Sequence, residues 1–298
     1  MFKRYKCKRC HQLFVWKNKG KSKDKQKTWF KKWVMGRRMV REIASEKKCS
    51  VSTVQRLFKE YLDNPPTPQI RNNKECHLMI DGTYTSDFCV IYYFDNDLKH
   101  LQYFEVVKSE NYLDFKLSLE LLKATELNII SITSDGDKGL IMAIREVFPG
   151  IRHQRCITHV QRMGLAYLTR FPKYKAGKEL RLIVNDLHKI YSHEDRTEWV
   201  KRYRDWEAIY YDFLNERNSL LSDIKLYKHY GIRRVRTLIN NSLPHLFHYL
   251  DDPKIPKSNN GLECRFSYLK NNLRFHRGLS NKHRRSFLLW YNWFKYND

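Results

Sequence analysis

Residues 77–83 have the sequence HLMIDGT, an apolar run that stops at an Asp-Gly pair beginning with Asp81. A second stretch, IISITSDG at residues 129–136, stops in the same way at Asp135. Short β-branched or aliphatic runs that stop at Asp-Gly are typical of buried strands that deliver a carboxylate at their exposed end. Asp-Gly also marks ordinary turns, which is the simpler explanation for either stretch taken alone.

A third carboxylate follows much later in the chain. Residues 258–263 have the sequence SNNGLE, which opens a predicted helix containing Glu263, with Asn259 or Asn260 available to cap it. Two strand-end Asp residues suit a Mg²⁺ pair, and a Glu on a later helix supplies a third ligand. In a chain of formal charge +25, this combination predicts a hard-metal site within a nucleic-acid-binding surface.

The order of elements around the two Asp residues predicts the fold class. Strands are expected at 77–84, 88–94, 100–107, 128–134 and 151–157, with helices at 111–125 and 138–147. Three antiparallel-looking strands followed by alternating helix and strand indicate an α/β, ribonuclease H-like fold with the first and fourth strands side by side. Adjacent strands lie about 4.8 Å apart, so Asp81 and Asp135 are expected to share metal ions.

Composition excludes several classes of protein. The 298 residues are 42% hydrophobic, which is ample for a core, yet no run approaches the roughly 18 apolar residues that span a bilayer. Seven cysteines, an odd number, argue against a disulfide framework. We therefore expect a soluble protein of a reducing cytoplasm and no membrane partner.

Positive charge gathers at the two ends of the chain. Residues 1–48 hold 18 Lys and Arg against 3 acids, and residues 254–298 hold 10 against 2. Such fields attract polyanions, and the high aromatic content indicates a folded nucleic-acid binder rather than a disordered tail. Charge alone leaves a ribosomal or membrane-surface role open, but DNA or RNA is favoured.

The first region, residues 1–35, contains half of a zinc-ribbon pattern in Cys7 and Cys10. A closed structural zinc site needs four ligands, and only six residues precede Cys7. Three explanations stay open: the ribbon is truncated by a late start of the reading frame, His11 and a distant Cys such as Cys49 complete the site, or no zinc binds.

Residues 36–64 carry two apolar stripes separated by a short polar stretch, the pattern of two helices joined by a tight turn. This segment resembles a helix-turn-helix, with Ser50 or Ser52 as cap of the second helix, although the usual turn Gly is absent. An ordinary helical hairpin is the alternative. The residues predicted to face bases and phosphates are Ser52, Thr53, Gln55, Arg56 and Lys59.

The rest of the chain divides by pattern. The predicted regions are a Pro-rich linker at 65–75, the first part of the core at 76–160, a helical insertion at 161–255, and the catalytic helix with a basic C-terminal region at 256–298. Aromatic residues of the insertion, such as Trp199, Tyr203 and Trp206, recur at helical spacing, which favours core packing over base stacking.

Taken together, these motifs resemble bacterial insertion-sequence transposases of the Mutator-like DDE superfamily, over roughly residues 35 to 285. The matching pieces are Asp81-Gly82-Thr83, Ser134-Asp135-Gly136, Cys156-Ile157-Thr158-His159, Ser258 to Glu263, Leu269-Lys270 and Arg277-Gly278-Leu279. The resemblance implies a catalytic triad of Asp81, Asp135 and Glu263 that binds Mg²⁺ or Mn²⁺. It also implies double-stranded DNA partners, namely terminal inverted repeats and target DNA, and a homodimer that holds two element ends. The location that this resemblance implies is that of a bacterial protein associated with the nucleoid.

Two further groups complete the expected site. The resemblance places Cys156 and His159 near the triad in a supporting role, although either can simply pack at a strand-to-helix junction. Lys270, two helical turns after Glu263, is expected to meet substrate phosphate, together with Arg274 and Arg277.

Three other functions compete with transposition. A nuclease or resolvase of the same fold would cleave DNA without joining it to a target. A regulator derived from a transposase would bind DNA without chemistry. A basic RNA-associated structural protein would leave the three carboxylates without a role.

Overall fold

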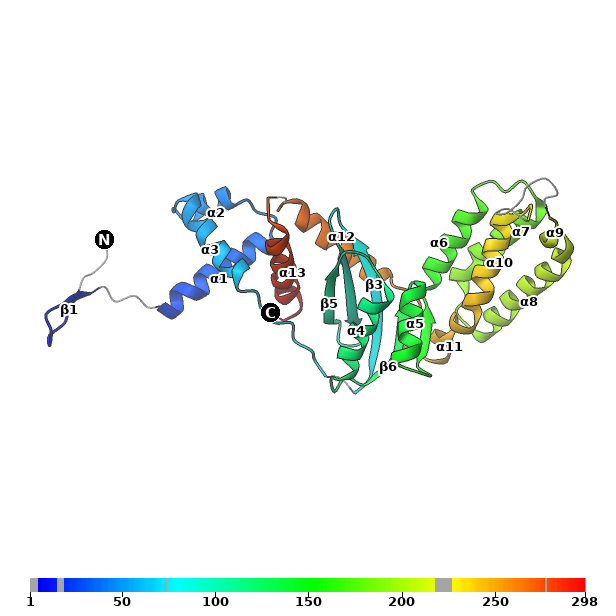
Figure 1. The fold of residues 1–298 in the computed structure, drawn as a ribbon, viewed down its shortest axis with the longest axis horizontal. Coiled ribbons are helices and arrows are strands. Elements are labelled where there is room, and N and C mark those ends of the chain that lie inside the picture. Colours follow the sequence, from blue (N-terminus) through cyan, green and yellow to red (C-terminus); the bar gives the residue numbers. More distant parts are fainter. Residues whose placement is uncertain (1–4, 15–18, 73, 218–226, 277, 298) are drawn as a thin grey trace. The chain divides into compact units, whose positions relative to one another are not determined.

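The computed structural model describes residues 5–14, 19–72, 74–217, 227–276 and 278–297. The chain forms two compact units (Figure 1). We call residues 69–267 the sheet unit, and residues 1–68 together with 268–298 the helical unit. The helical unit therefore combines both ends of the chain.

The sheet unit contains a five-stranded mixed sheet, and all five predicted strands are present. The strands are β3 (Cys76–Tyr84), β4 (Cys89–Asp95), β5 (His100–Val107), β6 (Ile129–Ser134) and β7 (Arg152–Arg155). Their order across the sheet is β5-β4-β3-β6-β7. The pairs β3–β4 and β4–β5 are antiparallel, whereas β3–β6 and β6–β7 are parallel, so β3 joins the two kinds of pairing.

One face of this sheet is covered by α4 (Tyr112–Lys123) and α5 (Lys138–Val147), which lie side by side (Figure 1). Both helices begin at a side-chain cap, since Asn111 accepts from the N–H of Asp114 and Asp137 accepts from that of Leu140. Alternate residues of the strands point to this face. The core here includes Leu78, Ile80, Ile91, Ile132, Phe115, Leu119 and Ile144.

The opposite face of β3 carries Met79 and Asp81, because neighbouring side chains of a strand alternate. On this face the ring of Tyr92 in β4 lies 4.9 Å from that of Phe266 in α12 (Asn260–Arg274). This contact holds the first turns of α12 over the sheet. The residues of α12 from Tyr268 onward belong to the helical unit.

The segment after β7 is helical, as predicted for the insertion. Its elements are α6 (Ile157–Leu168), α7 (Lys175–Asp186), η1 (Leu187–Lys189), α8 (His193–Ile209), α9 (Tyr211–Asn215), α10 (Tyr230–Ser242), η2 (Leu243–His245) and α11 (His248–Asp251). Trp199, Tyr203 and Trp206 are buried in one core, which confirms the predicted packing role. The Trp199 Nε1–H donates to the Ile183 carbonyl oxygen at 2.7 Å, so its polar edge is satisfied as well.

The helical unit contains a small hairpin and four helices of its own. They are β1 (Tyr5–Lys6), β2 (Leu13–Phe14), α1 (Lys19–Met35), α2 (Val40–Glu46), α3 (Val51–Asp63) and α13 (Asn281–Tyr296). The two predicted short helices are present as α2 and α3, and Ser50 caps α3 by accepting from the Thr53 N–H at 3.2 Å. No helix in the described part of the chain is long and apolar enough to cross a membrane.

The core of the helical unit is aromatic. The ring of Phe30 in α1 lies 5.4 Å from Phe58, 4.7 Å from Tyr61 and 5.3 Å from Trp290, which joins α1, α3 and α13. The Trp290 Nε1–H also donates to the Tyr61 carbonyl oxygen at 2.8 Å. The sequence did not predict that residues 281–296 complete a core with the N-terminal helices.

Candidate active site

Asp81 and Asp135 follow directly from the pairing of β3 with β6. Ile80 is the register partner of Ser134, so the next residue of each strand lies at the same edge of the parallel pair. The prediction that Asp81 ends its strand was wrong, because β3 continues to Tyr84 along β4, with Asp81 opposite Tyr92. Asp81 instead marks the point where pairing with β6 stops, which leaves its side chain beside Asp135.

The carboxyl group of Asp81 is in an unfavourable environment for a charge. Its side chain is 7% exposed, and burial, followed by the negative charge of Asp135, raises its pKa to about 8. Glu263 and Glu110 add to this effect, against a hydrogen bond from the Gly82 N–H to Asp81 Oδ1 at 3.0 Å. A bound cation reduces the repulsion between like charges that lie close together at a buried position.

Glu110 is a fourth carboxylate in the surroundings of Asp81 and Asp135, and no sequence pattern indicated it. The Tyr84 hydroxyl donates to Glu110 Oε2 at 3.2 Å, while burial and then Asp135 raise the Glu110 pKa. A Cβ atom on Gly82 would lie 1.9 Å from Glu110 Oε1, so Gly82 makes room for this side chain. We call Asp81, Glu110, Asp135 and Glu263 the carboxylate cluster.

The start of α12 is fixed to the strands by Asn259. Its backbone N–H donates to the Cys156 Sγ at 3.2 Å, and its side-chain Nδ2–H donates to the Ile80 carbonyl oxygen at 2.9 Å. Of the two Asn residues predicted as caps of α12, Asn259 does not cap it through its side chain, because its Oδ1 has no hydrogen-bond partner among the described residues. Asn260 is the first residue of the helix itself. Asn259 thereby places Glu263, one turn later, near Asp81.

Glu263 is paired with a cation that the sequence did not single out. Both carboxylate oxygens accept from Arg162, Oε1 from Nη1 and Oε2 from Nη2 at 3.1 Å, and His159 Nε2 lies 3.8 Å from Oε1. His159 and Arg162 are three residues apart on α6, so they share one face of that helix. The Arg162 side chain is 57% exposed, which keeps it accessible to another anion.

The donor set of the carboxylate cluster suits a hard divalent cation, since carboxylate oxygens are the ligands that Mg²⁺ and Mn²⁺ favour. Among the residues that the structure describes, no three His, Cys, Asp or Glu side chains form a group that could hold a metal ion. Asp81, Asp135 and Glu263 offer oxygens of this kind, and those of Glu263 are paired with Arg162.

Cys156 and Arg155 lie at the end of β7, beside β6. Burial raises the pKa of Cys156 to about 11, so the thiol is neutral, and its sulfur accepts the Asn259 N–H. Its place is the strand-to-helix junction, one of the two predicted alternatives. Arg155 was not predicted: its Nη2–H donates to the Asp135 carbonyl oxygen at 3.3 Å. Gly136, with φ +89°, leaves the space that this guanidinium fills.

The remaining predicted residues lie in the helical unit. Ser52, Thr53, Gln55, Arg56 and Lys59 are all exposed on α3, as a nucleic-acid-facing surface requires. Lys270 is partly buried and Arg274 exposed, whereas Arg277 lies outside the described residues.

The Cys7-Cys10 turn belongs to the small hairpin. Hydrogen bonds from the backbone N–H groups of Cys10 and Arg9 lower the pKa of Cys7, which favours the thiolate form that binds metals. Within the described ranges, neither His11 nor Cys49 joins these thiols in a group able to hold a metal. Zinc binding stays a prediction.

Residues 98–224 match the family model described as Transposase, Mutator family. The matched range includes Asp135, Cys156, His159 and Arg162, while Asp81 and Glu263 lie outside it. The match supports a Mutator-like transposase, the family that the motifs resemble. No curated protein matched the chain.

Proposed function

We propose that this chain is a metal-dependent DDE transposase that cuts DNA at the ends of its element and joins those ends to target DNA. The observation that carries the proposal is the carboxylate cluster. Asp81 and Asp135 lie side by side on parallel strands, and Asn259 ties the helix that bears Glu263 to the same place. A family match over residues 98–224 supports transposition as the process that uses this chemistry.

The sheet supports a ribonuclease H-like architecture for the catalytic part. In the order β5-β4-β3-β6-β7, an antiparallel meander continues into parallel strands at β3, with α4 and α5 as the connecting helices. This arrangement brings Asp81 and Asp135 together although 54 positions separate them. The helical insertion then precedes the helix that carries Glu263.

The side chains around the cluster have separable roles in this mechanism. Two divalent cations, when bound, would orient the attacking and leaving oxygens of a phosphodiester and neutralise the charge that develops there. Asp81 and Asp135 would hold these ions, and Glu263 would exchange its Arg162 partner for one of them. Arg162, then free to pair with another anion, would hold a DNA phosphate close to the site. His159 would position Glu263 or donate to the phosphate.

The test uses DNA bearing the terminal repeats found beside the gene, incubated with the full chain and Mg²⁺ or Mn²⁺. Cleaved ends and products joined to target DNA are expected from the wild type, and neither from Glu263→Gln. Cleavage without joining would favour a nuclease or resolvase. Specific binding without cleavage by the wild type would favour a DNA-binding regulator and contradict the proposal.

Recognition of the element ends is proposed for α3. Its exposed polar residues carry donors for base edges and phosphates, and Ser50 fixes the start of the helix that presents them. The excess of positive charge in residues 1–48 also favours binding of a nucleic acid. A homodimer on DNA completes the proposal, because two element ends have to be held together.

A further inference from the structure

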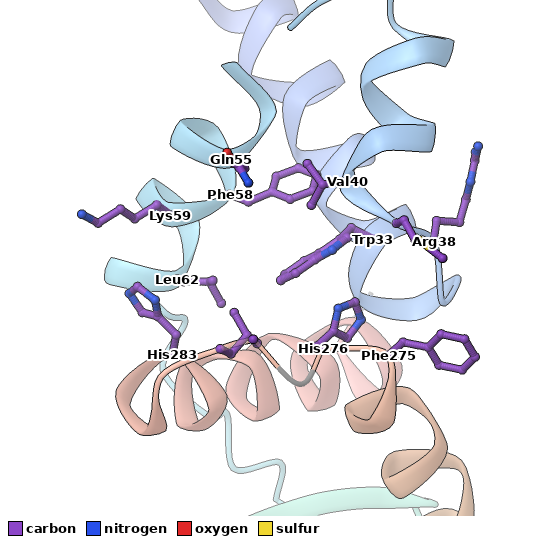
Figure 2. Close-up of a pocket in the computed structure, with 13 residues that line it drawn as sticks. Trp33, Arg38, Val40, Gln55, Phe58, Lys59, Leu62, Phe275, His276 and His283 are labelled. Atoms are coloured by element: carbon purple, nitrogen blue, oxygen red, sulfur yellow. The ribbon is translucent and has the colours of Figure 1, made fainter. Parts of the chain in front are cut away.

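The helical unit contains a cavity of about 460 Å³ between α1, α3 and the turn before α13 (Figure 2). The rings of Trp33 and Phe58 pack against each other, with centroids 5.0 Å apart, and together line one apolar side of the cavity. The ring of His276 lies 4.4 Å from that of Trp33. Met39 lines the cavity and is 63% exposed, so the cavity is open at that side chain. Its size and aromatic lining fit a small planar ligand.

The polar groups around this cavity are basic or neutral. Figure 2 shows Arg38 and Lys59 on opposite sides, with Trp33, Phe58 and His276 between them. No carboxylate lines the cavity within the described residues, although Glu42 and Glu46 pair with Arg38 from outside it. An anionic group attached to the ligand would therefore meet positive charge at the rim.

His276 supplies an unused hydrogen-bonding group. Its side chain is only 6% exposed, and its Nε2 atom has no hydrogen-bond partner among the described residues. The ring makes a hydrogen bond to the backbone of Trp33, which must use Nδ1 because Nε2 has no partner. Burial lowers the pKa of His276 to about 4, so the ring is neutral and Nε2 presents a lone pair. A buried acceptor without a donor is costly, and a ligand N–H would satisfy it.

We propose that this cavity receives one unpaired nucleobase of the bound DNA, with Trp33 and Phe58 as its apolar side and His276 Nε2 as acceptor for a base N–H. Every nucleobase is planar, carries an N–H donor or amine, and is attached to a phosphate. These are the three features that the apolar side, His276 and the basic rim would recognise. The inference rests on the DNA binding in the proposed function.

The experiment compares two probes that carry the same phosphate charge. One is a short duplex with a single bulged adenine, and the other is the same duplex with an abasic residue at the bulge. Anisotropy titration of the full chain is expected to show about tenfold tighter binding of the adenine probe, because one stacked base contributes about that factor. Equal affinity for the two probes would overturn the proposal.

Two variants locate the effect. Met39→Trp fills the open side of the cavity and is expected to abolish the preference, whereas Met142→Trp, at a side chain 59% exposed on α5, is expected to retain it. His276→Phe keeps a buried ring but removes the acceptor, and is expected to reduce the preference several-fold at unchanged abasic affinity. A preference that survives both cavity variants would overturn the assignment.

Other outcomes also decide the proposal. One such outcome is that the full chain self-associates, that Met39→Trp prevents the association, and that the adenine probe is not preferred. That result would assign the cavity to a second copy of the chain instead of a nucleobase. Absence of binding to either probe would contradict the DNA-binding function itself as well as this inference. Equal, measurable binding of both probes would contradict the inference alone, so the two failures are distinguishable.

Discussion

The carboxylate cluster of the sheet unit and the aromatic core of the helical unit both join residues that are far apart in sequence. The contacts of the aromatic core stabilise the fold, whereas those of the carboxylate cluster destabilise it. Around Phe30, apolar rings pack and the Trp290 N–H finds an acceptor, so the contacts stabilise the fold. Around Asp81, burial and then the negative charge of Asp135 raise the pKa of its carboxyl group to about 8. An arrangement that costs stability is more informative about function than one that stabilises.

The largest effect expected from this comparison is on catalysis. Asp135→Asn removes one charge of the cluster at nearly constant shape, and strand cleavage should fall by about 10³-fold or more, since metal-ion stabilisation of the transition state amounts to several kcal/mol. Asp137→Asn is the matched control, because Asn also caps α5. Cleavage assays on end DNA measure both. Equal activity of the two variants would remove Asp135 from the site.

A smaller effect is expected at the contact that fixes α12. Asn259→Ala deletes the hydrogen bond to the Ile80 carbonyl oxygen and should lower the free energy of unfolding by about 1–3 kcal/mol. Cleavage should also fall, by about tenfold or more, because Glu263 loses its placement. Urea unfolding and cleavage assays measure the two effects, with exposed Asn260→Ala as control. Loss of stability without any loss of cleavage would show that Asn259 has a structural role only.

The sequence predicted the strands, the two Asp residues and α12, because these depend on local patterns. Apolar runs that stop at Asp-Gly and a helix that opens with SNNGLE are visible within a few residues. Arg162 was missed, since its contact with Glu263 spans 101 positions and an exposed Arg on a helix is ordinary in sequence. Glu110 and Arg155 were missed for the same reason: neither has a periodic signal, and both owe their environment to the tertiary fold.

The aromatic core shows a second limit of the sequence. No sequence pattern indicated that residues 281–296 would pack on the N-terminal helices, because those partners are more than 200 positions away. Deleting residues 1–64, a natural test of DNA recognition, would remove α1 and α3 and expose the apolar face of α13. Single substitutions on α3 therefore test recognition more cleanly than truncation does.

A moderate effect is expected from Arg162→Ala. If Arg162 provides the counter-charge of Glu263, its removal should tighten Mn²⁺ binding about fivefold, the equivalent of about 1 kcal/mol for a partly exposed ion pair. The same change should weaken binding of DNA phosphate near the site. Arg202→Ala, which removes a comparable pair with Asp186, is the control for Mn²⁺ titration. Unchanged Mn²⁺ affinity in Arg162→Ala would contradict the proposed exchange.

The smallest effect is expected at the proposed recognition surface. Arg56→Ala should weaken DNA binding a few-fold and reduce the salt dependence of binding by about one counterion if Arg56 contacts a phosphate. Arg170→Ala, an exposed Arg of the sheet unit, should leave both quantities unchanged. Titrations at several salt concentrations measure the slope. If affinity and salt dependence changed equally in the two variants, DNA binding would depend on the overall positive charge of the chain and not on α3.

The central claim is that Asp81 and Asp135 are held together to bind a divalent cation, at a cost to the metal-free fold. The pKa of Asp81 is higher in the folded state than in the unfolded state, so protonation of Asp81 stabilises the fold. This stabilisation is fully present below the unfolded pKa near 3.8 and is lost as the pH rises through about 8. At pH 8 without metal, Asp81→Asn should therefore unfold at a higher temperature than the wild type. Asp212→Asn, at an exposed position on α9, should not differ from it.

The most direct test is thermal unfolding of the full chain at pH 8, in EDTA and in Mn²⁺, for the wild type, Asp81→Asn and Asp212→Asn. The account predicts that Mn²⁺ raises the melting temperature of the wild type and of Asp212→Asn, and that it leaves Asp81→Asn, already more stable in EDTA, unchanged. An equal Mn²⁺ shift in all three proteins, with no gain for Asp81→Asn in EDTA, would contradict it.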